Sequence, residues 1–411
     1  MIPYARQDII EEDRLAVERI LKSDWLTQGP TVPSFESKVA SYCGARDAVA
    51  TNSATSALHV ACLALGLGPG DWLWTSSNSF VASANCGLYC GAKIDFVDIE
   101  MTSYNMCADL LETKLEEAER KGVLPKIVIP VHFAGQAPNM LKIKELAEHY
   151  KFYVIEDASH ALGASYSLNI DPFSKAVCSE ESYNNKNLSK EQTRTVGDCY
   201  CSDVTVFSFH PVKIITSGEG GMAVTNDEFI AQRMKLFRSH GITRDPDRIK
   251  TSDEAPWLYN QVELGFNYRM TDIHAALGIS QLGRLDQFVA QRHSLAGVYH
   301  ELLKQMPITL PEQKPDCYSA MHLYPVLLSS AAERREVFNF FQSRDVKVNV
   351  HYFPIHLQPY FKAFGFSEGD FINSEDYYQR TLSLPMYPTL LEEQQKTVTN
   401  IFGDALKCLR K

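Results

Sequence analysis

Two residues of opposite charge follow predicted buried strands at positions where they could do chemistry together. Asp157 ends the run Phe152–Asp157, and Lys213 lies just beyond Val204–His210, before a glycine-rich turn at 218–221. A lysine held away from water has a lowered pKa and becomes nucleophilic. A carboxylate can keep a pyridine nitrogen protonated, so the two together are what a pyridoxal phosphate site requires. Taken singly, a surface lysine and a capping or solvated carboxylate also fit these positions.

A phosphate-binding turn is predicted at residues 50–58, where a strand runs through small hydroxyl residues into an apolar helix. Free amides at a helix N-terminus, the positive end of its dipole and Ser or Thr hydroxyls together bind phosphate. An ordinary N-cap is the alternative for residues 53–56. Ser208, shortly before the lysine, offers another hydroxyl. Phe80 follows the predicted strand at 71–76 and either stacks on a cofactor ring or fills the core.

Short apolar runs alternate with helical patterns between residues 45 and 225, which is typical of a mostly parallel sheet covered on both faces. Several runs are continuously apolar, as strands buried on both faces are. The predicted strands are Asp47–Thr51, Asp71–Ser76, Lys93–Asp98, Ile127–His132, Tyr153–Asp157, Val204–Ser208 and Gly221–Thr225. The helical stretches between them include Ser53–Leu65, Ala108–Lys121 and Met140–Tyr150. The predicted fold class is α/β, with a mostly parallel seven-stranded sheet.

A smaller α+β domain is predicted at residues 271–411, after a large domain at 1–270. It opens with a long helix whose N-cap is Thr271. The other predicted elements are the strand His322–Leu328, the helix Ala331–Gln342, the strictly alternating strand Val346–Tyr352 and the closing helix Leu391–Leu409. Residues 167–198 are polar and without periodicity, so they are predicted to be a surface insertion in the large domain.

Composition and charge exclude several classes of protein. The 411 residues include 45% hydrophobic and 22% charged residues, the mix of a folded, water-soluble protein. With 40 Lys and Arg against 50 Asp and Glu, the net charge is −10, so no global positive field would hold nucleic acid or an anionic membrane. The ten cysteines lack paired metal-ligand spacing and predict core thiols without a metal site. Neither a leader nor a membrane-spanning stretch is recognisable, which predicts a cytoplasmic location.

Four segments together resemble a known family. They are Ser-Phe-His-Pro-Val-Lys-Ile-Ile-Thr-Ser-Gly-Glu-Gly-Gly around Lys213, Asn-Ser-Ala-Thr-Ser-Ala-Leu ending at Leu58, Glu-Asp-Ala-Ser-His-Ala-Leu-Gly ending at Gly163, and Gly-Phe-Asn-Tyr-Arg-Met ending at Met270. These are similar to the motifs of DegT-type nucleotide-sugar aminotransferases, over nearly the whole chain. The resemblance implies the aspartate aminotransferase fold (PLP fold type I) for the large domain and pyridoxal 5'-phosphate as cofactor.

Further segments, at 25–30, 237–245, 349–360 and 382–388, resemble one branch of this family best. That branch transfers the amino group of L-glutamate, which leaves as 2-oxoglutarate, to C4 of a UDP-linked 4-keto-6-deoxy-N-acetylhexosamine. The substrate is UDP-2-acetamido-2,6-dideoxy-β-L-arabino-hex-4-ulose, and the product is UDP-4-amino-4,6-dideoxy-N-acetyl-β-L-altrosamine, on the route to pseudaminic acid. The insertion at 167–198 departs from the compact family pattern.

The resemblance also implies roles for residues that match the motifs. Lys213 would form the covalent link to the cofactor and, once released, move a proton between substrate and cofactor. Asp157 would pair with the pyridine nitrogen, Phe80 would cover the ring, and His160 would lie near its phenolic oxygen. Asn267 would reach the phosphate of the neighbouring subunit's cofactor, which makes the active site a property of a homodimer. The residues implied to bind the phosphate within one chain are Ala54, Thr55 and Ser208.

The candidates for contacts with the sugar nucleotide rest on weaker patterns. His351 lies on the polar face of the predicted strand at 346–352, where it faces either the site or solvent. Arg269 has paired N–H donors for a diphosphate or for the carboxylate of the amino donor, and a structural ion pair is its alternative. The remaining substrate candidates are Thr27, Gln28, His240 and Tyr324.

Three other functions are compatible with this pattern to different degrees. The chain could aminate a different nucleotide-linked keto sugar, or be a sugar dehydratase of the same fold, or be a non-catalytic regulatory module that binds the cofactor. The dehydratase relatives resemble this family with histidine in place of the lysine, and Lys213 is present. The acidic balance and the lack of a helix-turn-helix disfavour direct DNA binding.

Overall fold

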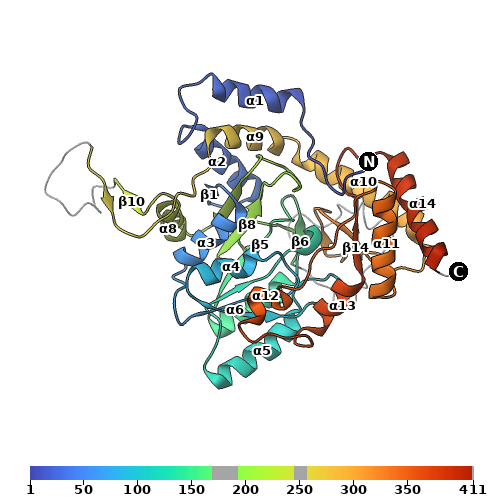
Figure 1. Cartoon of the computed structure of the whole chain (residues 1–411). Coiled ribbons are helices and arrows are strands. Elements are labelled where there is room, and N and C mark those ends of the chain that lie inside the picture. Colours follow the sequence, from blue (N-terminus) through green and yellow to red (C-terminus); the bar gives the residue numbers. More distant parts are fainter. Residues whose placement is uncertain (169–192, 245–256, 410–411) are drawn as a thin grey trace.

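A seven-stranded sheet forms the centre of the large domain (Figure 1). The computed structural model describes residues 1–168, 193–244 and 257–409. The strand order is β1-β9-β8-β5-β4-β2-β3, and within this sheet only β9 runs against its neighbours. The strands are β1 (Asp47–Thr51), β2 (Trp72–Ser76), β3 (Lys93–Val97), β4 (Ile127–Ile129), β5 (Tyr153–Asp157), β8 (Val204–Ser208) and β9 (Gly221–Thr225). The predicted sheet is confirmed, although β2, β3 and β4 are shorter than expected.

Alternate residues of each strand pack on opposite faces of the sheet, and helices cover both faces. Ala48 and Ala50 of β1 belong to one apolar core, whereas Val49 belongs to the other. The first core includes residues of α2 (Thr31–Cys43), α5 (Ala108–Lys121) and α6 (Met140–Tyr150), and the second includes residues of α3 (Ala54–Ala64), α4 (Ala82–Tyr89) and α8 (Glu228–Arg238). Because both faces exclude water, the strands are near-continuous apolar runs in the sequence.

Side-chain caps set where several helices begin. The hydroxyl of Ser53 accepts a hydrogen bond from an amide of α3, and Asn139 and Asp227 do the same for α6 and α8. The predicted bounds of α5 and α6 are confirmed. Helix α3 is shorter than predicted by one residue at each end, since Ser53 and Leu65 cap it.

The long helix predicted after Thr271 is instead two helices, α9 (Asp272–Leu282) and α10 (Leu285–Leu303). Thr271 is the N-cap, as expected, and its hydroxyl accepts a hydrogen bond from the amide of His274. The break lies at Arg284, whose guanidinium forms ion pairs with Asp8 (2.7 Å) and Asp13 (2.6 Å) of the N-terminal segment. These long-range ion pairs join α1 (Glu11–Leu21) to the end of α9.

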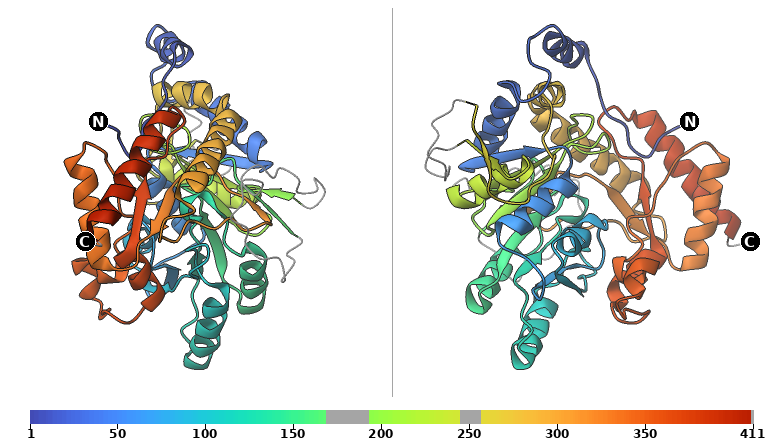
Figure 2. Two further views of the ribbon diagram at one scale, coloured as in Figure 1. Left: turned by 90° about the vertical axis from the view of Figure 1, so that its right-hand side faces the viewer. Right: turned by 60° about the vertical axis from the view of Figure 1, so that its left-hand side comes forward.

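The small domain has its own apolar core, built on α10, α11 (Ala331–Ser343), α14 (Glu392–Leu409) and the antiparallel pair β13 (Tyr324–Leu327) and β14 (Thr381–Leu384). The predicted strand at 346–352 is wrong. Single bridges join Val346 to Ile2 and Asn349 to Ser383, and no continuous ladder forms there. The alternation arises because Val346 and Val348 point into the core between polar residues. The N-terminus therefore lies beside the C-terminal domain (Figure 2).

Residues 352–380 return to the large domain, across the domain boundary expected at residue 270. This segment contains the short helix η3 (Ile355–Leu357), α12 (Pro359–Lys362) and α13 (Ile372–Arg380). Ile355, Phe361 and Phe371 pack in the same core as α3 and α4. The amide of Ile355 donates a hydrogen bond to the carbonyl oxygen of Ser77 (2.9 Å). Part of the expected small domain thus belongs to the core of the large one.

Two smaller sheets lie beside the central one, and Tyr166, Cys317 and Tyr318 of the first pack in or against the core of the large domain. A three-stranded sheet joins β6 (Ser165–Ser167), β7 (Thr193–Thr195) and β12 (Cys317–Tyr318), and a hairpin of β10 (Ile242–Thr243) and β11 (Asn260–Gln261) projects from the sheet end at the left of Figure 1. Most of the insertion predicted at 167–198 lies outside the described residues. Among the described helices, none combines the length and apolar character needed to cross a bilayer.

Asp98 of the large domain contacts α13, and its substitution would test whether residues 352–380 are anchored in that domain. The Asp98 carboxylate accepts hydrogen bonds from the amides of Asn373 (2.8 Å) and Ser374 (2.9 Å) and from the Ser374 hydroxyl (2.6 Å). We expect Asp98→Ala to destabilise the protein by about 2–3 kcal/mol, because three donors lose a charged acceptor. Thermal melting and limited proteolysis within 352–380 measure the effect.

The matched control is Asp376→Ala in the same helix, where the carboxylate forms an exposed ion pair with Arg380. Its loss is expected to change stability by less than about 1 kcal/mol. Equal effects of the two substitutions would show that the Asp98 contact does not anchor the segment.

Candidate active site

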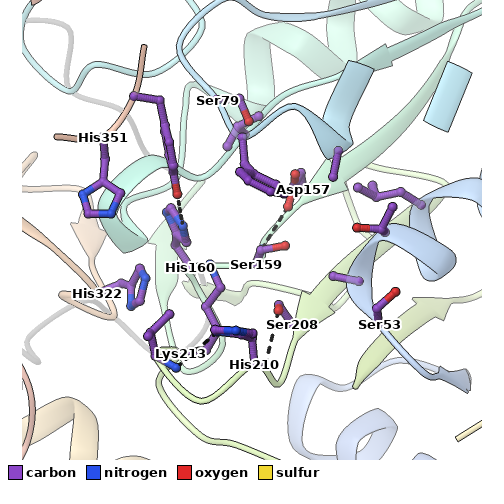
Figure 3. A pocket seen from close by; sticks show the side chains of 18 of the residues that line it. Ser53, Ser79, Asp157, Ser159, His160, Ser208, His210, Lys213, His322 and His351 are labelled. Atoms are coloured by element: carbon purple, nitrogen blue, oxygen red, sulfur yellow. Dashed lines mark hydrogen bonds between the residues drawn. The ribbon is translucent and has the colours of Figure 1, made fainter. Parts of the chain in front are cut away.

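A cavity of about 520 Å³ lies between the carboxyl ends of β5 and β8 and the small-domain segment 349–352 (Figure 3). Ligands of open α/β sheets bind at this edge, where consecutive strands end together. The residues expected to hold the cofactor within one chain all line it, namely Ala54, Thr55, Phe80, Asp157, His160, Ser208 and Lys213. The fold therefore brings together side chains that are up to about 160 positions apart in the sequence.

Asp157 ends β5, and its carboxylate is held by two hydrogen bonds. The hydroxyl of Ser83 donates to Oδ2 (2.6 Å), and the amide of Ser159 donates to Oδ1 (3.2 Å). Ser83 is itself hydrogen-bonded to Ser79 (2.9 Å between the hydroxyl oxygens). These hydrogen bonds fix the orientation of the carboxylate where it lines the cavity. A fixed orientation suits a group that pairs with a ring nitrogen.

Glu156, the neighbour of Asp157, is buried on the opposite side of β5 and was not singled out from the sequence. Its carboxylate accepts hydrogen bonds from the hydroxyls of Ser202 (2.5 Å) and Thr205 (3.0 Å) and lies 2.7 Å from Nε2 of His132. Burial opposes ionisation, but these partners outweigh it and hold the pKa of Glu156 below its usual range. The pair of acids ending β5 was the available sequence signal. The buried network fixes the strand end that carries Asp157.

Lys213 follows β8 and faces the cavity. Burial lowers the pKa of the Lys213 amine to about 8, and the nearby negative charge of Asp157 opposes this shift. A substantial fraction of the amine is therefore neutral near physiological pH, unlike that of an ordinary lysine. A neutral amine is the form that attacks a carbonyl carbon.

The N-terminus of α3 forms one end of the cavity. The amides of Ala54 and Thr55 precede the first hydrogen-bonded turn of the helix, so they and the positive end of the dipole face the cavity. Gly221 allows β9 to pass close to this turn, because a Cβ at that position would lie 2.4 Å from the Ala54 amide nitrogen. Ser208 adds a hydroxyl. This donor set fits a phosphate group.

Aromatic side chains form the opposite part of the wall. Phe80 is 58% exposed, so one of its faces is available to a planar ligand. Nε2 of His160 lies 3.1 Å from the hydroxyl of Tyr352, and the ring of His160 lies 4.3 Å from that of His322. Burial and the positive charge of Lys213 hold the pKa values of both histidines well below their usual range, so both rings are neutral. Sequence reasoning missed Tyr352 and His322.

Several predicted residues do not line the cavity of this chain. Asn267, Arg269 and His240 lie together on another surface, where Asn267 bridges to Ser239 and Arg269 donates to the Ser239 hydroxyl (3.3 Å). Thr27 and Gln28 lie near this surface, because Thr27 forms a β-bridge with Thr271, two residues after Arg269. Of the predicted substrate residues, only His351 lines the cavity.

Tyr324 lies elsewhere in the molecule. It begins β13, is fully buried in the core of the small domain and packs against Tyr299 at a ring distance of 5.1 Å. In this structure Tyr324 is therefore a core residue of the small domain.

The cysteines, histidines and acids of the described residues form neither a disulfide nor a metal site. All nine cysteines in the part of the chain that the structure describes are free thiols, and most are buried. Across residues 1–168, 193–244 and 257–409, no group of three His, Cys, Asp or Glu side chains has the geometry to hold a metal ion.

The donor set as a whole fits pyridoxal phosphate. The helix N-terminus faces the phosphate position, Asp157 supplies a carboxylate for the ring nitrogen, Phe80 supplies an exposed ring face, and Lys213 supplies a desolvated amine.

Comparison with known proteins agrees with this geometry. Residues 7–402 match the model of the DegT/DnrJ/EryC1/StrS aminotransferase family. The spore coat polysaccharide biosynthesis protein SpsC of Bacillus subtilis is 34% identical, over 99% of this chain and 97% of that protein. The UDP-4-amino-4,6-dideoxy-N-acetyl-beta-L-altrosamine transaminase of Campylobacter jejuni is 33% identical, over 100% of this chain and 99% of that protein.

Solved structures show the same fold. PseC of Helicobacter pylori, an aminotransferase involved in the biosynthesis of pseudaminic acid, superposes with a TM-score of 0.83 at 26% identity, over 99% of both chains. The PLP form of the putative sugar aminotransferase Spr1654 of Streptococcus pneumoniae superposes with a TM-score of 0.84 at 25% identity, over 99% of this chain and 98% of that chain. With the cavity described above, these likenesses place the chain in the DegT/DnrJ/EryC1/StrS family, as a pyridoxal-phosphate-dependent sugar aminotransferase.

Proposed function

We propose that the protein transfers the amino group of L-glutamate to C4 of the UDP-linked keto sugar UDP-2-acetamido-2,6-dideoxy-β-L-arabino-hex-4-ulose. The product would be UDP-4-amino-4,6-dideoxy-N-acetyl-β-L-altrosamine. The observation that carries the proposal is the desolvated amine of Lys213 facing Asp157 in one cavity. The choice of sugar is supported by full-length likeness to the Campylobacter transaminase and to PseC.

In this proposal, Lys213 binds the cofactor and handles the proton. Pyridoxal phosphate, when bound, supplies a reactive carbonyl carbon and a ring that accepts electrons. Lys213 would hold the cofactor through its amine and, when that amine is free, would take and return a proton at the substrate carbon, which a pKa of about 8 permits in both directions. Asp157 would hold the ring nitrogen protonated, and Ala54, Thr55 and Ser208 would bind the phosphate.

A second copy of the chain completes the site in this proposal. Among the described residues that line the cavity, Lys213 is the only Lys or Arg, and the ligands of the reaction carry several negative charges. Asn267, Arg269 and His240 share one surface, so a partner that presents Asn267 would also present the other two. The apolar side chains of Trp257 and Leu264 near that surface are each 78% exposed, which favours burial against a second copy.

Amination of another nucleotide-linked keto sugar is the second candidate function. The likeness to SpsC is as high as that to the altrosamine transaminase, and the name of SpsC points to a different polysaccharide route. Both candidates use the same donor half-reaction and differ only in the acceptor.

The two half-reactions can be followed separately. We expect L-glutamate alone to bleach the visible absorbance of the cofactor bound to the purified protein, and the UDP-linked 4-keto-6-deoxy-N-acetyl sugar to restore it, because the two substrates use the site in turn. The Lys213→Ala protein is the control and should show neither change. Bleaching without recovery by this sugar would favour another acceptor, and cofactor absorbance insensitive to glutamate would contradict a transaminase.

The lowered pKa of Lys213 predicts a pH profile for its chemical labelling. In cofactor-free protein, reductive methylation by formaldehyde and cyanoborohydride should become half-maximal near pH 8, where an ordinary lysine is under about 1% neutral. Asp157→Asn removes the negative charge that raises the pKa of Lys213, so its profile should move to lower pH. Peptide mass spectrometry reports each lysine, with the exposed Lys38 as internal control. Labelling of Lys213 that parallels Lys38 would contradict a desolvated amine.

A shared active site predicts complementation between inactive variants. Lys213→Ala and Asn267→Asp, refolded or co-expressed together, should regain about a quarter of wild-type activity, because half the dimers are mixed and each mixed dimer has one intact site. Lys213→Ala mixed with Asp157→Ala is the control, since both residues belong to one chain's cavity and no intact site can form. Failure of the first mixture to exceed the second would place Asn267 outside the partner's site.

A further inference from the structure

One part of the cavity wall is built from residues that the proposed cofactor and proton chemistry does not use. It consists of Tyr4, from the N-terminal segment, with Asn349 and His351 of the small domain. This wall lies across the cavity from the α3 N-terminus, as His351 and Ser53 do in Figure 3. A cofactor held by α3, Asp157 and Lys213 leaves this wall for a substrate.

The N-terminal segment is held firmly enough to place Tyr4. The carbonyl oxygen of Tyr4 accepts a hydrogen bond from the amide of Met386 (3.0 Å). Two residues earlier, Ile2 bridges to Val346, and its amide donates to the carbonyl oxygen of Asp345 (2.9 Å). The first residues of the chain are therefore part of the small-domain surface that faces the cavity.

The hydrogen bonds along this wall assign a donor and an acceptor to each group. Oδ1 of Asn349 accepts from the amide of Val350 (2.8 Å), so the amide nitrogen of Asn349 points the other way, 3.3 Å from Nε2 of His351. Because that amide donates to Nε2, the proton of His351 is on Nδ1, which donates to the Ser383 hydroxyl (2.9 Å). The chain of donors thus starts at Asn349 and runs into β14.

Tyr4 lies at the open end of this chain. Its hydroxyl is hydrogen-bonded to the side chain of Asn349, and its ring lies 5.9 Å from that of His351. The amide nitrogen of Asn349 has two N–H donors and uses one on His351, so it can donate the other to the Tyr4 oxygen and leave the Tyr4 proton for a ligand in the cavity.

The wall is uncharged. Burial lowers the pKa of His351 to about 3, with the positive charge of Lys213 contributing, so the imidazole is neutral. Burial raises the pKa of Tyr4, and the bond from Asn349 offsets it only in part, so the phenol keeps its proton. A neutral donor in such a place suits an uncharged oxygen and offers no counter-charge to a carboxylate or phosphate.

We propose that the Tyr4 hydroxyl, oriented by Asn349 and His351, donates a hydrogen bond to an uncharged oxygen of the acceptor sugar. That oxygen is a ring hydroxyl or the carbonyl of an acetamido group. The inference rests on the proposed function, because it concerns the sugar that this function takes as its acceptor. Tyr4 and Asn349 then discriminate the sugar from the dicarboxylate donor, which occupies the same cavity in the other half-reaction.

Tyr4→Phe removes the donor and leaves the ring in place. We expect the KM for the UDP-linked 4-keto-6-deoxy-N-acetyl sugar to rise about tenfold and the KM for L-glutamate to change less than about threefold. The matched control is Tyr360→Phe, where the side chain is 64% exposed and distant from the cavity wall, and both KM values should stay within error. Circular dichroism and cofactor absorbance verify that the variants are folded and loaded.

A double-mutant cycle tests the orienting role of Asn349. If Asn349 acts through Tyr4, Asn349→Ala should raise the KM for the sugar, and the double variant with Tyr4→Phe should match the worse single variant rather than the product of the two. Independent, multiplicative effects would overturn the orienting role.

The outcomes separate this inference from the function on which it rests. An unchanged KM for the sugar in Tyr4→Phe, or equal rises for sugar and glutamate, would overturn the inference while the wild-type protein still turns over the sugar. A wild-type protein that is bleached by glutamate but does not aminate this sugar would overturn the proposed acceptor, and this inference with it.

Discussion

The desolvated amine of Lys213 is the constraint on which the rest of the structure depends. An ammonium group is costly to remove from water. Because the fold buries the Lys213 amine, its pKa falls to about 8 and part of it is neutral. The site must also be reachable by substrate, so the lysine cannot lie in the core. It lies where β5 and β8 end side by side, with Asp157 paired to Val206 in the parallel register. Helices on both faces of the sheet exclude water from everything but this edge.

The residues behind Asp157 and Lys213 are held rigidly, which keeps the Lys213 amine away from water. Asp157 and Glu156 point to opposite sides of β5, one into the cavity and the other into the core. The buried carboxylate of Glu156 is tolerated because Ser202, Thr205 and His132 surround it. On the cavity side, the small-domain chain is tied down at Tyr352, whose amide donates to Asn78 (3.2 Å), and then continues into the core of the large domain. The wall facing Lys213 is therefore held from both domains.

Sequence reasoning could find what depends on neighbours along the chain. Lys213, Asp157 and the turn at 53–55 follow strands that are recognisable because they are apolar throughout, and their convergence follows from parallel topology. It could not find what depends on distant contacts. The break before α10 falls at Gly283 and Arg284, and the pairing of Arg284 with Asp8 and Asp13 of the N-terminal segment is a contact that the local sequence does not reveal. The alternation of apolar and polar residues at 346–352 arises because the valines are buried against helices, and little strand pairing forms there. Tyr4 and His322 reach the cavity only through the packing of the small domain.

Electrostatics favours the proposal that a second chain completes the site. The protein carries a net charge of −10, and the proposed function has it bind a phosphorylated cofactor, a dicarboxylic amino acid and a nucleotide diphosphate sugar. Within one chain, the described part of the cavity answers these charges with the dipole of α3 and with Lys213, whose amine is partly neutral. The wall opposite is made of neutral donors. Negative charge at the reacting centre would raise the pKa of Lys213 and suppress its nucleophilic form. In the proposed homodimer, Arg269 of the partner subunit would meet the negative charges of the ligands, so that Lys213 need not serve as their counter-charge and its amine stays partly neutral.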